Sequence, residues 1–196
     1  MRLLVATQNP GKQQEIRSLL KTSGIELLFP NQIPTVANLD VAETGKTFAE
    51  NAELKARAFA QESGIASIAE DTGLQVAVLG GEPGVASKRW LSGSDYDRNK
   101  ALLDRLADNP HRAAKFVTVA YFYDPISAVG RSFTGEMSGE IAMKISNDTG
   151  FGYDSIFIPT EEKEVLAKLG LNKKNTISHR SIAFTQVVEY LQKINL

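Results

Sequence analysis

The chain has 196 residues, of which 42% are hydrophobic and 23% are charged, a composition typical of a globular protein with a complete hydrophobic core. Its formal net charge of −1 argues against a broad nucleic-acid-binding surface, and the absence of cysteine excludes disulfide bonds, a thiol nucleophile and a Cys-ligated zinc site. No apolar run approaches the roughly 18 residues that would cross a bilayer. We therefore expect a cytoplasmic protein that binds neither nucleic acid nor a membrane.

Short strands and helices alternate in the first third of the chain. Asn9 and Pro10 favour a helix start, because asparagine caps the unpaired amides of a first turn and proline fits the first helical position. Thr47 and Glu50 have the spacing of a capping box at the start of a second helix. We predict strands over 3–6, 25–28 and 65–69, helices over 10–21 and 47–63, and a loop over 30–45.

Strands dominate the middle of the chain. Residues 116–123 are rich in aromatic and β-branched types, and 131–137 and 140–145 predict a hairpin that turns at Ser138-Gly139. A further strand is expected over 156–158, and helices are expected over 95–106 and from Ser178 onward. This order of elements predicts an α/β fold with a mixed central sheet flanked by helices.

The first candidate site is the turn from Thr7 to Lys12, between a strand and a helix. The unpaired amides and the dipole of a helix start favour a bound phosphate. Lys12 lies in the same first turn, where the dipole disfavours a cation unless an anion is present. The alternative is an ordinary capped helix with a solvated lysine. Neither Lys12 nor Lys46 belongs to a P-loop, because Ala6 and Asp40 stand where that motif requires glycine.

The second candidate site contains carboxylates and a lysine. Glu70 and Asp71 follow an apolar strand, and because side chains alternate along a strand only one of them should face a given site. Glu43 supplies another carboxylate, and Mg²⁺ takes one or two carboxylates together with phosphates and water. Lys55 shares a helix face with Asn51. The alternative is two solvated acids and a lysine that extends past the core to solvent.

The third candidate site combines an aromatic ring with cations. Glycines flank Phe151 and would leave its ring accessible for stacking on a base. His179 and Arg180 open the last helix, again at the end where the dipole disfavours cations, and Lys174 lies in the preceding segment, which we expect to be a loop. The alternative is an ordinary glycine turn beside a solvated basic patch.

Together these segments resemble the Ham1/inosine triphosphatase family of non-canonical purine NTP pyrophosphatases. The matching motifs occur in the order of the family and span nearly the whole chain. They are ATQNPGK at 6–12, ETGKTFAENAELKA at 43–56, EDTGL at 70–74, GEPGV at 81–85, FGYD at 151–154 and ISHR at 177–180. Departures from the family pattern are Gln8, Glu70 and Lys88, which bear on fine substrate preference.

The resemblance implies a single two-lobed domain over residues 1–196, a homodimer, and Mg²⁺-dependent hydrolysis of ITP, dITP and XTP to the monophosphate and pyrophosphate. It also implies roles for individual residues. Glu43 and Asp71 would hold Mg²⁺, and Asp71 would also activate the attacking water. The remaining residues would contact the purine nucleoside triphosphate: Thr7, Gln8, Asn9, Pro10, Gly11, Lys12 and Lys55 at the phosphates, Thr72 elsewhere on the substrate, and Phe151, Gly152, Tyr153, Asp154, Lys174, His179 and Arg180 at the base.

Selectivity would come from the edge of the base. Inosine and xanthosine carry a carbonyl at position 6, which cationic donors satisfy, whereas the amino group of adenosine would leave those donors unpaired. Two alternatives remain open at this point: a related pyrophosphatase with another base preference, and a nucleotide-binding protein without catalysis.

Overall fold

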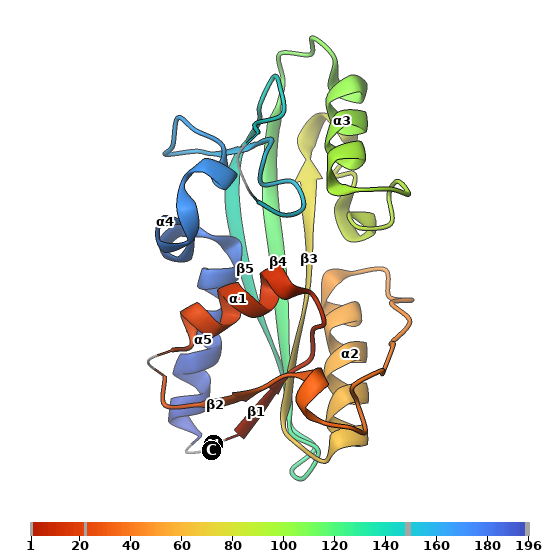
Figure 1. Cartoon of the computed structure of the whole chain (residues 1–196), viewed down its shortest axis with the longest axis vertical. Coiled ribbons are helices and arrows are strands. Elements are labelled where there is room, and N and C mark those ends of the chain that lie inside the picture. The colour runs from red at the N-terminus through yellow and green to blue at the C-terminus, as the bar shows by residue number, and fades with distance from the viewer. Residues whose placement is uncertain (1, 22, 148–149, 195–196) are drawn as a thin grey trace. The chain divides into compact units, whose positions relative to one another are not determined.

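The computed structural model describes residues 2–21, 23–147 and 150–194, and the chain divides into two compact units (Figure 1). The first unit comprises residues 1–71, 118–135 and 179–196, and the second comprises 72–117 and 136–178. The strands form a six-stranded sheet in the order β2-β1-β3-β4-β5-β6. Their bounds are β1 Arg2–Val5, β2 Glu26–Leu28, β3 Ser67–Val76, β4 Ala113–Tyr123, β5 Gly130–Ile141 and β6 Phe157–Pro159. The helices are α1 Pro10–Leu19, α2 Phe48–Ser63, α3 Asp95–Leu106, α4 Gly170–Ile177 and α5 His179–Lys193.

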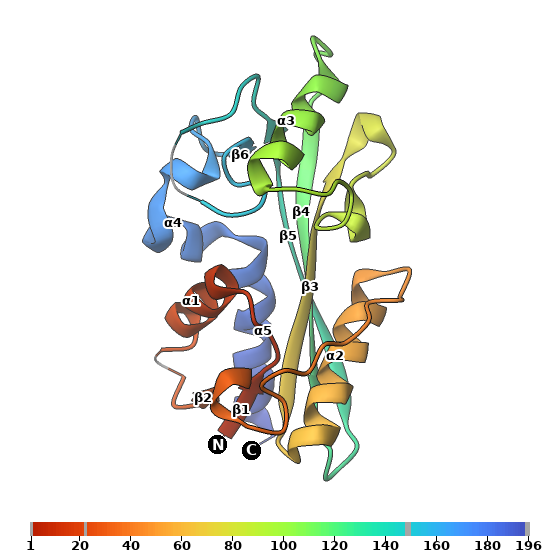
Figure 2. The same cartoon turned by 45° about the vertical axis from the view of Figure 1, so that its right-hand side comes forward.

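The first unit has helices on both faces of its strands. Alternate residues of β1 point to opposite faces, so Leu3 and Val5 join one core while Leu4, together with Ala6 just after the strand, joins another. The first core contains residues of α1 and α5, and the second contains the alanine-rich face of α2. Figure 2 shows α1 and α5 on one side of β1 and α2 on the other. This three-layer arrangement brings the starts of α1 and α5 to the same face of the sheet.

The sheet is mixed, as the sequence predicts. β1 pairs in parallel with β2 and β3, whereas β5 pairs antiparallel with β6. The second unit has one core, in which Leu102 and Leu106 of α3 pack with residues of β3, β4, β5 and β6. Among the described residues, no helix combines the length and the apolar character that crossing a bilayer requires.

Local signals correctly predicted the starts of α1, α2, α3 and α5. Asn9 caps α1, Thr47 and Glu50 form a capping box at α2, and the last helix begins after Ser178. Three predictions were wrong. β3 continues through 70–73 to Val76, β5 is one strand where a hairpin was expected, and α4 occupies the segment with Lys174 where a loop was expected.

Candidate functional site

The start of α1 has the geometry of an anion-binding helix terminus. The side chain of Asn9 accepts a hydrogen bond from the Lys12 amide at 3.1 Å, and Thr7 Oγ1 accepts one from the Asn9 amide at 3.2 Å. The Gln13 side chain donates to the Thr7 carbonyl at 2.8 Å. These contacts fix the turn from Thr7 to Lys12, in which Gln8 and Pro10 are exposed and Gly11 is half-buried. The predicted phosphate-binding residues from Thr7 to Lys12 therefore form one ordered turn, while Lys55 lies on α2.

Lys12 is not a solvated lysine. Its ammonium lies 3.0 Å from Glu70 Oε1, and its side chain is only 18% exposed. Burial lowers the pKa of Lys12, and the neighbouring cations Lys55 and Arg180 lower it further, while Glu70 opposes the shift. An ammonium has three donors, so its ion pair with Glu70 is compatible with a further contact to a phosphate oxygen.

Glu70 connects Lys12 to a buried arginine. Arg180 donates from Nε and Nη2 to the two Glu70 oxygens, each at 2.8 Å, and its Nη1 pairs with Glu15 of α1. Burial alone would raise the pKa of Glu70, but Arg180 and then Lys12 outweigh it, so this carboxyl titrates below its usual range. The network contains two cations and two carboxylates, and its members come from α1, β3 and α5.

Arg180 is 1% exposed, and both of its carboxylate partners are buried as well. The observed ion pairs of the Arg180 guanidinium are with Glu70 and Glu15, so the predicted contact between Arg180 and the base stays a prediction. His179 is also buried, at 2% exposed.

Gly135 of β5 explains how the start of α5 comes so close to the sheet, since a Cβ at that position would lie 2.0 Å from the His179 carbonyl oxygen.

Asp71 has a different set of partners, as strand alternation predicts. Asn51 of α2 donates to Asp71 Oδ2 at 3.1 Å, and the Lys55 ammonium lies 3.6 Å from Asp71 Oδ1 and 2.5 Å from Glu43 Oε1. Burial raises the pKa of Asp71, and the Glu43 carboxylate adds to this increase, while Lys55 opposes it. The structure thus brings the two predicted metal ligands to the same lysine.

Asn51 joins this group to the loop that bears Glu43. Its Oδ1 accepts a hydrogen bond from the Gly45 amide at 2.8 Å while its amide donates to Asp71. A Cβ on Gly45 would lie 2.7 Å from that oxygen, so the close approach requires glycine. Sequence reasoning placed Asn51 on the helix face of Lys55 but did not include it among the site residues, and it missed Glu15 entirely.

The second unit contains five of the residues predicted to bind the base, Phe151, Gly152, Tyr153, Asp154 and Lys174, whereas His179 and Arg180 belong to the first unit. The Lys174 ammonium lies 4.5 Å from the centre of the half-buried Phe151 ring and 2.5 Å from Asp154 Oδ2. Tyr153 is buried, donates to the Ser87 carbonyl at 2.9 Å and has its pKa raised by burial to about 12. Lys174 and Asp154 are therefore paired inside this unit, with Phe151 beside them. Thr72, at the start of the same unit, is half-buried.

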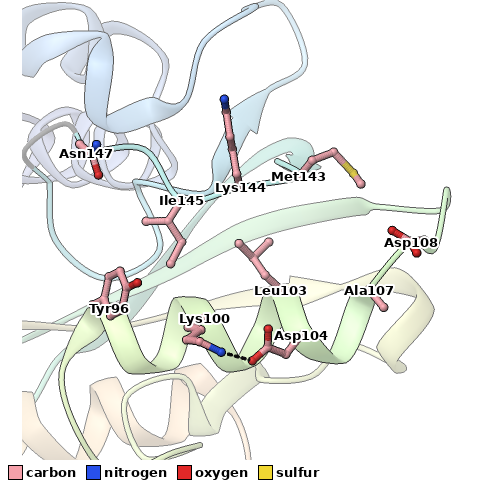
Figure 3. A pocket seen from close by; sticks show the side chains of 10 residues that line it. All are labelled: Tyr96, Lys100, Leu103, Asp104, Ala107, Asp108, Met143, Lys144, Ile145 and Asn147. Atoms are coloured by element: carbon pink, nitrogen blue, oxygen red, sulfur yellow. Dashed lines mark hydrogen bonds and ion pairs between the residues drawn. The ribbon is translucent and has the colours of Figure 1, made fainter.

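A separate pocket of about 620 Å³ lies between α3 and residues 143–147 (Figure 3). It contains an exposed ion pair between Lys100 and Asp104 at 2.6 Å. None of the residues predicted to bind substrate lines this pocket, so we do not assign the substrate to it. Its lining consists of Tyr96, Lys100, Leu103, Asp104, Ala107, Asp108, Met143, Lys144, Ile145 and Asn147.

Comparison with known proteins shows the family of this chain. The Ham1 family model matches residues 3–190. A dITP/XTP pyrophosphatase of Symbiobacterium thermophilum is 45% identical over 97% of this chain and 94% of its own length, and one of Aquifex aeolicus is 38% identical over 98% and 97%. The Ham1 protein structures of Coxiella burnetii and Staphylococcus aureus superpose with TM-scores of 0.88 and 0.86, each at 33% identity and covering 98% of this chain and 99% of the other. The chain belongs to the Ham1 family.

Proposed function

We propose that this chain hydrolyses ITP, dITP and XTP to the corresponding monophosphate and pyrophosphate. The observation that carries the proposal is the group formed by Asp71, Lys55 and Glu43 in a protein related over nearly its whole length to dITP/XTP pyrophosphatases. A buried carboxylate beside a lysine and a second carboxylate is suited to activating water next to a polyphosphate.

The start of α1 is the proposed binding site for the triphosphate. The positive end of the helix dipole attracts a phosphate oxygen, and Lys12 and Lys55 add positive charge. Because Lys12 is held by Glu70 and Lys55 by Glu43, both ammonium groups are positioned before substrate arrives. Such preorganised charge stabilises a transition state more effectively than mobile side chains do.

Glu43 and Asp71 are the proposed ligands of Mg²⁺. Their donor set fits this ion, which takes one or two carboxylates and completes its shell with phosphate oxygens and water. Among the described residues no group of three or more acidic or histidine side chains forms a protein-only metal site, which is consistent with an ion shared with the substrate. When bound, Mg²⁺ would offset the charge that builds up on the leaving pyrophosphate.

Asp71 is the proposed base. Burial raises its pKa, so its carboxylate is a better proton acceptor than that of a solvated aspartate. It would take a proton from water as the water oxygen bonds to the α-phosphorus and the bond from that phosphorus to the bridging oxygen breaks. The electron pair of the broken bond leaves with pyrophosphate. Asn51, which donates to Asp71, would hold the carboxylate in place.

Phe151 is the proposed stacking surface for the purine. Asp154, Lys174, His179 and Arg180 are proposed to surround the base, and their cationic donors would favour a position-6 carbonyl over an amino group. A homodimer and a cytoplasmic location also belong to the proposal. The first rests on the family resemblance and the second on the cysteine-free composition.

A panel of nucleoside triphosphates tests the proposal when orthophosphate and pyrophosphate are measured separately. ITP, dITP and XTP should be hydrolysed far faster than ATP and GTP, and ITP should give IMP and pyrophosphate in a single step. Accumulation of IDP with orthophosphate would mean attack at the γ-phosphorus and would refute the proposal. Equal rates for all purines would leave the pyrophosphatase activity but refute the base preference.

A further inference from the structure

The segment that bears Phe151 is tied to helix α3 by two side chains four residues apart, Asp95 and Asn99. Residues at this spacing share one helix face. Asp95 Oδ2 accepts a hydrogen bond from the Gly152 amide at 2.6 Å, and Asn99 Nδ2 donates to the Gly152 carbonyl at 3.0 Å. Asn99 Nδ2 also donates to Ser155 Oγ at 2.8 Å. All of these residues belong to the second unit.

Both backbone polar groups of Gly152 are therefore held by one helix. Gly152 has a φ of 64°, in the left-handed region, and no side chain that could anchor it. Its amide belongs to the peptide bond that joins it to Phe151. Holding the amide and the carbonyl together restrains the backbone of Gly152 and the plane of the peptide bond that it shares with Phe151, and so restrains the backbone that carries the Phe151 ring.

The two side chains of α3 are themselves well anchored. Arg98 pairs with Asp95 and also donates to the Gly93 carbonyl at 2.7 Å. Burial would raise the pKa of Asp95, but Arg98 and the Gly152 amide outweigh it, so its carboxylate stays ionised as an acceptor. Asn99 is 2% exposed.

Asn99 uses only its donor end within the described part of the chain, where its buried Oδ1 has no hydrogen-bond partner. The hydrogen bonds described for this side chain therefore both come from its amide nitrogen. The hydrogen bond from this nitrogen to the Gly152 carbonyl accounts for an asparagine at position 99.

We propose that Asn99, supported by Asp95, is a positioning residue that holds Gly152 so that the Phe151 ring presents its face to the purine. This inference rests on the proposed function, in which Phe151 stacks on the base. Two other contacts also restrain the segment around Gly152: Lys174 lies beside the Phe151 ring, and Tyr153 donates a hydrogen bond to the Ser87 carbonyl. Loss of the Asn99 side chain should therefore misplace the ring without unfolding the unit.

The test compares Asn99→Ala, Phe151→Ala and the double variant, with ITP as substrate and inorganic triphosphate as a competitive inhibitor that has no base. Phe151→Ala should raise KM for ITP roughly 5- to 150-fold, the range for losing one stacked base. Asn99→Ala should raise it about 10-fold while changing kcat and the inhibition constant of triphosphate less than about 2-fold. The double variant should be no worse than Phe151→Ala, because Asn99 acts through the ring.

Lys100→Ala is the matched control, since Lys100 is the next residue of α3, is exposed and contacts Asp104 instead of the Gly152 segment. It should leave KM unchanged. Hydrogen exchange adds a readout independent of activity: the Gly152 amide should exchange at least about 10-fold faster in Asn99→Ala than in Lys100→Ala.

The outcomes distinguish the positioning role of Asn99 from the proposed function of Phe151. If Phe151→Ala raises KM but Asn99→Ala does not, or if the two effects multiply in the double variant, the positioning role is overturned while the proposed function stands. If Phe151→Ala leaves KM unchanged, the proposed base site fails and the positioning role fails with it. A lower melting temperature for Asn99→Ala with unchanged KM would assign Asn99 to stability alone.

Discussion

Glu70→Gln should destabilise the protein strongly, because it breaks a buried ion pair without changing the size of the side chain. The Glu70 and Arg180 side chains are each 1% exposed, and two hydrogen bonds of 2.8 Å join them. The variant removes the negative charge that pairs with both Arg180 and Lys12, while the ion pair of Arg180 with Glu15 remains. A buried cation that loses its counter-charge has no solvent to compensate for it.

Breaking one partner of a buried pair costs about 3–5 kcal/mol. In a chain of this size, 1 kcal/mol moves the melting temperature by roughly 2–4 °C, so Glu70→Gln should melt about 6–20 °C below the wild type near neutral pH. Glu53→Gln is the matched control. Glu53 also pairs with an arginine, at 2.7 Å, but the two side chains are 40% and 39% exposed, and solvent screening should keep its effect to about 1 kcal/mol or less.

The dependence on pH provides a second check. The folded pKa of Glu70 lies below its ordinary value of 4.5, so folding favours the ionised form. Its contribution to stability is therefore fully present above about pH 4.5 and is lost as pH falls from there toward the folded pKa. Calorimetry of wild type and variant at several pH values should show a difference in melting temperature that is constant near neutrality and narrows in acid. A decrease of less than about 2 °C, or one equal to that of Glu53→Gln, would refute the role of the buried network.

Three further substitutions test other parts of the site. Asp71→Asn should lower kcat for ITP roughly 100- to 10,000-fold while circular dichroism stays native, and near-normal turnover with saturating Mg²⁺ would show that Asp71 is not the base. If the guanidinium contacts the base, Arg180→Ala, assayed below its melting transition, should lower kcat/KM for ITP about 10- to 150-fold more than for ATP. Equal losses of kcat/KM for the two substrates would limit Arg180 to holding Glu70 and, through it, Lys12. Gly135→Ala should cost about 1–3 kcal/mol in urea unfolding, because its Cβ would lie 2.0 Å from the His179 carbonyl oxygen, and an unchanged midpoint would contradict that close contact.

Local chemistry in the sequence determined where α1, α2 and α5 begin and which way neighbouring side chains point. The cap of α1 at Asn9 and the capping box of α2 depend on residues within one turn, so they could be identified without tertiary information. Strand alternation likewise separated the partners of Glu70 from those of Asp71. The ordered motifs also sufficed to identify the Ham1 family.

Only the tertiary structure decided which strands continue and which charges meet. The strand predicted to end at residue 69 continues to Val76, and the turn predicted at Ser138-Gly139 lies inside β5, because pairing with neighbouring strands outweighs the weak local preference of a glycine. The contact of Arg180 with Glu15 joins residues 165 positions apart, and that of Asn99 with Gly152 spans 53. No spacing rule predicts such contacts, since they depend on how helices pack on the sheet and on which charges burial forces to pair.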